Sequence, residues 1–252
     1  MTRFSANLGF LWNDLPLPEA IRAAKASGFH AVECHWPYET DASEIKAALE
    51  DTGLTMLGLN TLRGDVSAGE NGLSALPGRE AEARAAIDLA IDYADAVDAA
   101  AIHVMAGKAT GSKAHTVFLE NLAYAADRTR RTILIEPLNR HDAPGYFLES
   151  TTQASGIIAE LAISNLKLMF DCYHVGRSEG NVITRLTDLF LIVGHIQVAS
   201  VPHRRQPDHG ELHYPSIFSA ISELGWRRPI GAEYKPDGPT EGSLGWMHQY
   251  TR

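Results

Sequence analysis

The chain has 252 residues, of which 22 are basic and 31 acidic, so its formal net charge is −9 with histidine neutral. Hydrophobic residues make up 45% and charged residues 21%, a balance that excludes a disordered chain and is typical of a globular protein. The acidic balance opposes nucleic-acid binding, and no apolar run approaches the roughly 18 residues that a membrane-spanning helix needs, so neither nucleic acid nor membrane is expected as a partner.

Short apolar segments alternate with amphipathic segments along the whole chain. Because short apolar runs favour strands and an apolar period of about 3.6 residues favours helices, we expect eight strand–helix pairs. The strands are expected at residues 4–8, 31–35, 55–60, 101–105, 132–136, 166–171, 193–199 and 229–233. The helices are expected at residues 16–27, 42–51, 80–97, 113–129, 153–162, 181–190, 214–224 and 240–249.

This alternation predicts a parallel sheet covered by helices. Eight units in a chain of this length match a single-domain (β/α)8 TIM barrel over residues 1–252, and a doubly wound open sheet is the alternative. No Pro-, Gly- or Ser-rich linker divides the chain. Cys34 and Cys172 are too far apart in sequence for a CxxC metal pair and too few for a disulfide scaffold, so a reducing, cytoplasmic location is expected.

Four of the last strands carry, at or near their ends, a side chain that offers oxygen to a cation. Glu136, Asp171 and Glu233 end three of these strands, and Gln197 lies near the end of another. In a barrel the carboxyl ends of the strands meet at one mouth, so three carboxylates and one amide oxygen are expected to converge. A divalent cation that prefers oxygen, Mg²⁺ or Mn²⁺ rather than zinc, would relieve their repulsion. The alternative is that these acids simply face solvent.

Histidines and basic residues follow the same strand ends. His174, three residues after Asp171, is a candidate to bind a substrate oxygen or to transfer a proton. Arg204 is a candidate partner for a substrate carboxylate. Further candidate substrate contacts are His203 and Lys235, with Lys108 and Arg63 behind them. Each of these residues has an ordinary loop or surface role as its alternative.

Longer motifs extend this pattern over nearly the whole chain: RFSANL, NTLRGDVSAGENGLSALPGRE, IEPLN, FDCYH, GHIQVA, PHR, EYKP and GWM. On these motifs the chain resembles the hydroxypyruvate isomerase family of the xylose isomerase-like barrel superfamily. The resemblance implies that Glu136, Asp171, Gln197 and Glu233 bind the metal, that the two glutamates act as acid and base, and that His174 contacts the substrate. Related ketose epimerases have histidine at position 197, so glutamine favours the hydroxypyruvate isomerase branch. RRQPDHGELHY and Arg140-His141 depart from the family pattern.

The resemblance implies a reaction on a small anionic hydroxy-carbonyl acid, the interconversion of hydroxypyruvate and 2-hydroxy-3-oxopropanoate through an enediolate. One glutamate would remove a proton beside the carbonyl and the other would return it, while a hydride shift is the competing mechanism. The same site would serve an isomerase or epimerase of a longer 2-oxo acid, such as 2-oxo-tetronate, or of a ketose. More remote alternatives are a barrel-type DNA-repair endonuclease and a non-catalytic metal-binding barrel. A monomer and a homo-oligomer are both compatible with the sequence.

Overall fold

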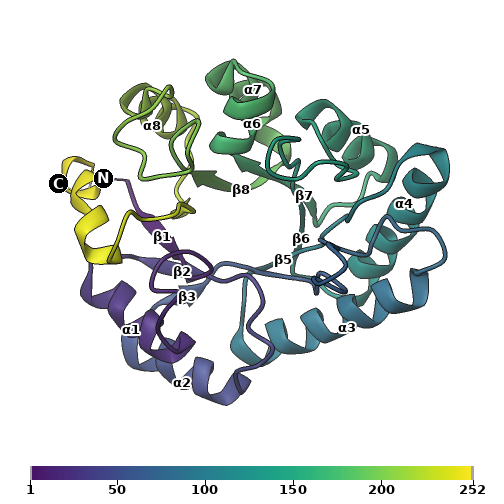
Figure 1. The fold of residues 1–252 in the computed structure, drawn as a ribbon, viewed down its shortest axis with the longest axis horizontal. Coiled ribbons are helices and arrows are strands. Elements are labelled where there is room, and N and C mark those ends of the chain that lie inside the picture. The colour runs from purple at the N-terminus through teal and green to yellow at the C-terminus, as the bar shows by residue number, and fades with distance from the viewer. Residues whose placement is uncertain (1, 251–252) are drawn as a thin grey trace.

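The structure, a computed structural model that describes residues 2–250, is a TIM barrel (Figure 1). All strand pairs are parallel, and the strand order is β3-β2-β1-β9-β8-β7-β6-β5-β4. Figure 1 shows the strands around the centre and the helices outside them, so the open-sheet alternative is wrong. The strands are β1 (Phe4–Asn7), β2 (Ala31–Glu33), β3 (Thr55–Met56), β4 (Leu59–Asn60), β5 (Ala101–His103), β6 (Thr132–Ile135), β7 (Leu166–Asp171), β8 (Val193–Val198) and β9 (Ile230–Ala232).

The barrel closes through one strand that is interrupted in the middle. β3 pairs with β2 and β4 pairs with β5, while only Leu57 and Gly58 separate β3 from β4. The backbone N–H of Leu57 donates to Val32 O at 2.7 Å, so pairing continues through the interruption. The predicted strand at 55–60 is therefore a single barrel strand with a local bend, and the nine short strands fill eight barrel positions.

Helices cover the outside of the sheet, and none within residues 2–250 is both long and apolar enough to cross a membrane. They are α1 (Leu17–Ala26), α2 (Ala42–Thr52), α3 (Glu80–Val97), α4 (Gly111–Arg128), α5 (Thr151–Leu161), α6 (Cys172–Ser178), α7 (Val182–Leu189) and α8 (Tyr214–Glu223). Short 3-10 helices are η1 (Phe190–Ile192), η2 (Thr240–Ser243) and η3 (Gly245–Gln249).

The observed helices differ from the predicted ones at two places. The short helix α6 follows β7 directly and was not predicted; it begins there because the Asp171 carboxylate accepts the Tyr173 backbone N–H at 2.7 Å and so caps its first turn. The helix expected at 240–249 is instead the pair of 3-10 helices η2 and η3. Gly242 and Gly245 lie within that segment, and glycine weakens an α-helix by about 1 kcal/mol relative to alanine.

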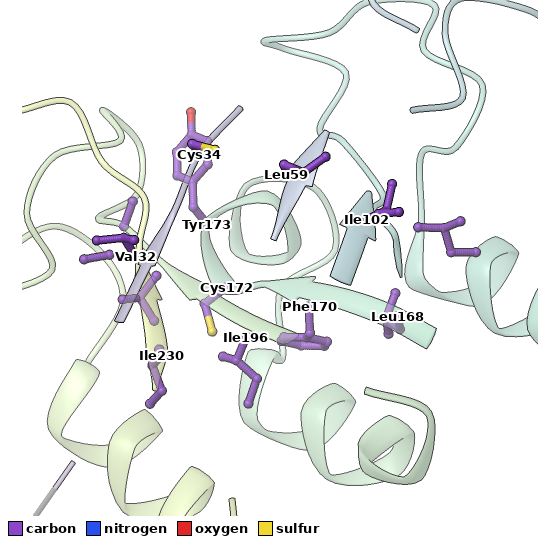
Figure 2. Close-up of a cluster of buried hydrophobic side chains, with 14 of the residues drawn as sticks. Val32, Cys34, Leu59, Ile102, Leu168, Phe170, Cys172, Tyr173, Ile196 and Ile230 are labelled. Carbon is purple, nitrogen blue, oxygen red and sulfur yellow. The ribbon is translucent and has the colours of Figure 1, made fainter. Parts of the chain in front are cut away.

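Side chains alternate between the helices and the barrel interior along each strand. On β7, Leu168 and Phe170 belong to the large apolar core, and Figure 2 shows Phe170 and Ile196 on the side of the strands that faces the helices. Met169 belongs instead to a small separate cluster and lines a cavity inside the barrel. Asp171 has the same parity as Met169, so the strand itself directs this carboxylate inward.

Candidate metal centre and active site

A cavity of about 170 Å³ lies at the carboxyl ends of the barrel strands. Pockets for drug-sized ligands enclose roughly 300–1,000 Å³, so this cavity suits a molecule of only a few carbon atoms. Its titratable lining includes carboxylates, imidazoles and a guanidinium, contributed by Glu136, Glu233, His35, His103, His174 and Arg204.

Each of the four predicted metal ligands presents one buried oxygen that has no hydrogen-bond partner among residues 2–250. We call these residues the mouth cluster; the oxygens are Glu136 Oε1, Asp171 Oδ2, Gln197 Oε1 and Glu233 Oε2. A buried polar group left unpaired costs about 1–3 kcal/mol, and more when it is charged. Four such oxygens on neighbouring strand ends therefore fit a hard divalent cation, for which oxygen is the preferred ligand.

His174 lies against two members of the mouth cluster. Its Nε2 is 3.8 Å from Glu136 Oε1 and 3.7 Å from Asp171 Oδ2, and one ligand atom from each of the three residues falls within 4.8 Å of the others. Burial, followed by the charge of Arg204, lowers the pKa of His174 to about 3, so the ring is neutral.

The tautomer of His174 follows from its other nitrogen. The backbone N–H of Asn139 donates to Nδ1 at 3.0 Å, and the Asn139 side-chain amide lies 2.8 Å from the same atom. Because a backbone N–H can only donate, the ring proton is on Nε2, which faces the carboxylates. His174 therefore suits donation to a substrate oxygen better than ligation of a metal.

Arg204 is the guanidinium inside the cavity. Its Nη2 lies 3.1 Å from Glu233 Oε2 and 3.5 Å from Asp171 Oδ2. The guanidinium also stacks 4.9 Å from the ring centre of Phe10 and 5.1 Å from that of Tyr173. These contacts hold a cation where a small anionic ligand would enter.

The acids of the mouth cluster differ in their electrostatic surroundings. Burial, together with the charges of Glu233 and Asp171, raises the pKa of Glu136. Burial also raises the pKa of Asp171, to about 7. Burial opposes the charged form of Glu233 as well, but Arg204 and a hydrogen bond from His35 Nε2 at 2.9 Å outweigh it and lower that pKa to about 2. Three crowded acids share one guanidinium, an arrangement that a divalent cation would stabilise.

Three predicted substrate contacts are placed outside the cavity. His203, Lys235 and Lys108 are exposed, and none of them lines it. Lys235 Nζ lies 5.7 Å from the ring centre of Phe10, which is a lining residue. Contact between these three side chains and a substrate stays a prediction. Arg63 stacks 3.8 Å from the ring centre of Trp36, another lining residue.

Sequence-based reasoning missed two residues at the end of the second strand. His35 donates to Glu233, and Glu33 Oε1 accepts a hydrogen bond from Gln197 Nε2 at 2.9 Å. The signal was available, because Glu33 and His35 end an apolar strand just as the mouth cluster does. His195, which lies inside β8, is buried and its Nε2 is 2.5 Å from Glu33 Oε2.

Known proteins of similar sequence and fold match this chain over nearly its whole length. The xylose isomerase-like TIM barrel family matches residues 21–250. A 2-oxo-tetronate isomerase of Cupriavidus necator is 44% identical over 99% of both chains, and the hydroxypyruvate isomerase of Escherichia coli is 37% identical over 99% of this chain and 100% of its own. A crystal structure described as an AP endonuclease of family 2 from Brucella melitensis has a TM-score of 0.95 at 38% identity, covering 99% of each chain. The chain therefore belongs to the xylose isomerase-like TIM barrel family, in which its full-length relatives include isomerases.

Proposed function

We propose that the chain is a divalent-metal-dependent isomerase that interconverts hydroxypyruvate and 2-hydroxy-3-oxopropanoate. The observation that carries this proposal is the set of four buried oxygens in the mouth cluster that accept no hydrogen bond from the described residues. Two residues of the cluster, Glu136 and Glu233, line the cavity sized for a small molecule. The hydroxypyruvate isomerase of Escherichia coli, aligned over the full chain, supports the choice of substrate.

Glu136, Asp171, Gln197 and Glu233 would hold the cation, with Mg²⁺ or Mn²⁺ suited to their oxygen atoms. A divalent ion bound there supplies positive charge that stabilises the negative charge developing on substrate oxygens. His174 stays outside the ligand set in this proposal, because its Nε2 carries a proton.

The chain's own side chains would orient the substrate and move its proton. Arg204 would bind the substrate carboxylate, since guanidinium pairs well with planar carboxylates. His174 Nε2–H would donate to a substrate oxygen. One of Glu136 and Glu233, which line the same cavity, would take a proton from the carbon that bears the hydroxyl group. The other, in its protonated form, would donate its own proton to the former carbonyl carbon, while the hydroxyl proton moves to the former carbonyl oxygen.

A second substrate is favoured by a specific observation. The relative of Cupriavidus necator, 44% identical over 99% of both chains, is a 2-oxo-tetronate isomerase, whose substrate is also a 2-oxo acid but is one carbon longer. The same acid/base pair would serve it. The name of the Brucella melitensis structure would imply a DNA substrate, which a net charge of −9 opposes.

The test is proton NMR in D₂O with metal-stripped protein, before and after addition of Mg²⁺, on hydroxypyruvate and on 2-oxo-tetronate in parallel. We expect conversion only with the metal, with deuterium entering the carbon chain, and the larger kcat/KM identifies the physiological substrate class. Conversion without deuterium would replace proton transfer by a hydride shift. An absence of conversion of either acid with metal bound would contradict the proposal.

A further inference from the structure

We propose that Asn7 and Glu33 are positioning residues, which orient the Gln197 side chain so that its amide oxygen faces the metal centre. The inference rests on the proposed function, because it concerns the same centre. Among the described residues, Glu33 is a buried carboxylate that makes no hydrogen bond to Glu136, Asp171 or Glu233.

The orientation of a side-chain amide decides what it can do beside a cation. Its oxygen is a ligand, whereas its NH2 group is only a donor and repels positive charge. Gln197 needs a fixed hydrogen-bond acceptor for its NH2 group if its oxygen is to face the metal centre. Glu33 provides one, because Gln197 Nε2 donates to Glu33 Oε1 at 2.9 Å and leaves Gln197 Oε1 buried, with no hydrogen-bond partner in the described part of the chain.

A backbone N–H determines which group donates and which accepts in this contact. The N–H of Gly9 donates to Asn7 Oδ1 at 2.9 Å, and since a backbone N–H can only donate, Asn7 must present Nδ2 on its other side. Asn7 Nδ2 lies 3.1 Å from Glu33 Oε1, so that oxygen accepts. An accepting Oε1 then requires Gln197 to present its NH2 group as well.

The second oxygen of Glu33 is also fully engaged. Ser5 Oγ donates to Oε2 at 3.2 Å, and His195 Nε2 lies 2.5 Å from it. Four groups from β1 and β8 therefore surround one carboxylate that is 3% exposed. We call Ser5, Asn7, Glu33 and His195 the Glu33 cluster. With two contacts on each oxygen, Glu33 offers Gln197 a well-anchored acceptor.

A glycine on the adjacent strand makes room for this contact. A Cβ atom at Gly231 would lie 2.6 Å from Glu33 Oε1 and 2.8 Å from Gln197 Cγ. Real Cβ atoms do not approach other atoms so closely. Three strands, β2, β8 and β9, are therefore matched around the Glu33–Gln197 pair, which indicates that the pair is built into the barrel rather than formed by chance.

Two substitutions separate orientation from charge. Glu33→Gln removes the charge but keeps an oxygen that can accept from Asn7 and Gln197, whereas Glu33→Met removes the acceptor in a chain of similar length. The experiment measures the Kd of Mn²⁺ for metal-stripped protein by isothermal titration calorimetry, with the melting temperature of each variant recorded alongside. Glu160→Met is the matched control, since Glu160 is an exposed carboxylate that lies 2.9 Å from a histidine nitrogen.

Loss of an outer partner of a metal ligand typically weakens binding about 10- to 100-fold, and we expect Glu33→Met to do so. Glu33→Gln should raise the Kd much less, and Glu160→Met should leave it unchanged. Equal weakening by Gln and Met at position 33 would mean that Glu33 acts through its charge, and would overturn the inference. So would a Glu33→Met protein that binds Mn²⁺ as tightly as the wild type.

A polarity swap keeps the inference testable when Glu33→Met does not fold. Gln197→Glu places two carboxylates against each other and should weaken Mn²⁺ binding. Because Asn7 Nδ2 donates to the same Glu33 oxygen as Gln197 Nε2, an inverted contact also needs Asn7→Asp. Glu33→Gln combined with Gln197→Glu and Asn7→Asp lets the new amide donate one hydrogen to each new carboxylate and should restore binding. A triple variant that binds no better than Gln197→Glu alone would overturn the inference. Wild-type protein that does not bind Mn²⁺ would instead refute the proposed metal centre, so the two failures are distinct.

Discussion

Two groups of carboxylates lie in the same barrel and differ in their hydrogen bonds rather than in their burial. Glu33 is 3% exposed and has four partners, whereas Glu136 and Glu233 are each 6% exposed. Within residues 2–250, Glu136 Oε1 and Glu233 Oε2 have no hydrogen-bond partner, although the Arg204 guanidinium lies 3.1 Å from Glu233 Oε2. Burial alone therefore does not mark a functional acid. The oxygen without a hydrogen bond distinguishes the proposed acid/base residues from Glu33, because a buried carboxylate oxygen that lacks hydrogen bonds is stabilised by a cation or a proton.

The largest expected effect is on the mouth cluster. Glu233→Gln keeps the shape of the side chain but removes its ability to exchange a proton, and we expect kcat to fall by about 10²- to 10⁴-fold. The measurement is the rate of isomerisation at saturating Mg²⁺, with Glu160→Gln as a control for the same substitution at an exposed site. Activity within tenfold of wild type would remove Glu233 from the acid/base pair.

Stability should respond with opposite sign in the two groups. Glu33→Met leaves several buried donors without an acceptor, and we expect it to lower the free energy of unfolding by about 3 kcal/mol. Glu136→Gln removes a crowded buried acid, and we expect it to raise that free energy by about 1 kcal/mol in metal-free protein.

The gain at Glu136 has a defined pH dependence. Because its folded pKa is raised, the wild-type acid favours the folded state below its unfolded pKa and loses this advantage as the pH rises. The gain from Glu136→Gln should therefore be larger at pH 8 than at pH 4. Urea denaturation of both variants at the two pH values is the measurement, and the same sign of change for Glu33→Met and Glu136→Gln at pH 8 would invalidate the comparison.

Substitution of Arg204 tests whether its guanidinium, which lies beside the mouth cluster, binds the substrate. Hydrogen bonds to charged groups contribute about 1.5–3 kcal/mol, so Arg204→Gln should raise KM for a 2-oxo acid about 10- to 100-fold. Initial rates over a range of substrate concentrations give KM and kcat separately. A fall in kcat at unchanged KM would assign Arg204 to the carboxylates of the protein instead of that of the substrate.

The smallest effect concerns pH and metal affinity. Burial raises the pKa of Asp171 to about 7 and raises that of Glu136, so protons compete with a cation for both side chains. We expect Mn²⁺ affinity to fall by up to about tenfold for each pH unit below 7 and for each proton displaced. Calorimetric titration at pH 6, 7 and 8 in buffers of different ionisation enthalpy counts these protons. An affinity independent of pH would show that the acids bind the metal without losing a proton.

The mouth cluster could be predicted because its position follows from the chain alone. Glu136, Asp171 and Glu233 each close an apolar strand, and strand order plus period-2 alternation then directs them inward. The tautomer of His174 could not be predicted, because it depends on a backbone N–H of Asn139, 35 residues earlier in the chain. Such information exists only once the barrel has closed.

The position of Glu33 at a strand end could have been predicted, but its hydrogen-bond partners could not, for a related reason. Glu33 and His195 are 162 positions apart in the chain, and only closure of the barrel brings them together. The fold itself was easier to predict, since eight apolar strands and their helices repeat along the sequence. The prediction of an α-helix at 240–249 was wrong because the spacing of apolar residues there is helical, whereas the two glycines favour the tighter turns of 3-10 helices.

The missing side chain at Gly231 has a consequence for directed evolution of this protein. Positions 33, 197 and 231 share one packed space across three strands, so single substitutions in a library should be rejected at position 231 while Glu33 and Gln197 keep their size. A smaller residue at position 33 would not by itself admit alanine at position 231, because the new Cβ would still lie 2.8 Å from Gln197 Cγ. Libraries for selection experiments should therefore vary positions 33, 197 and 231 together, although they are far apart in the sequence.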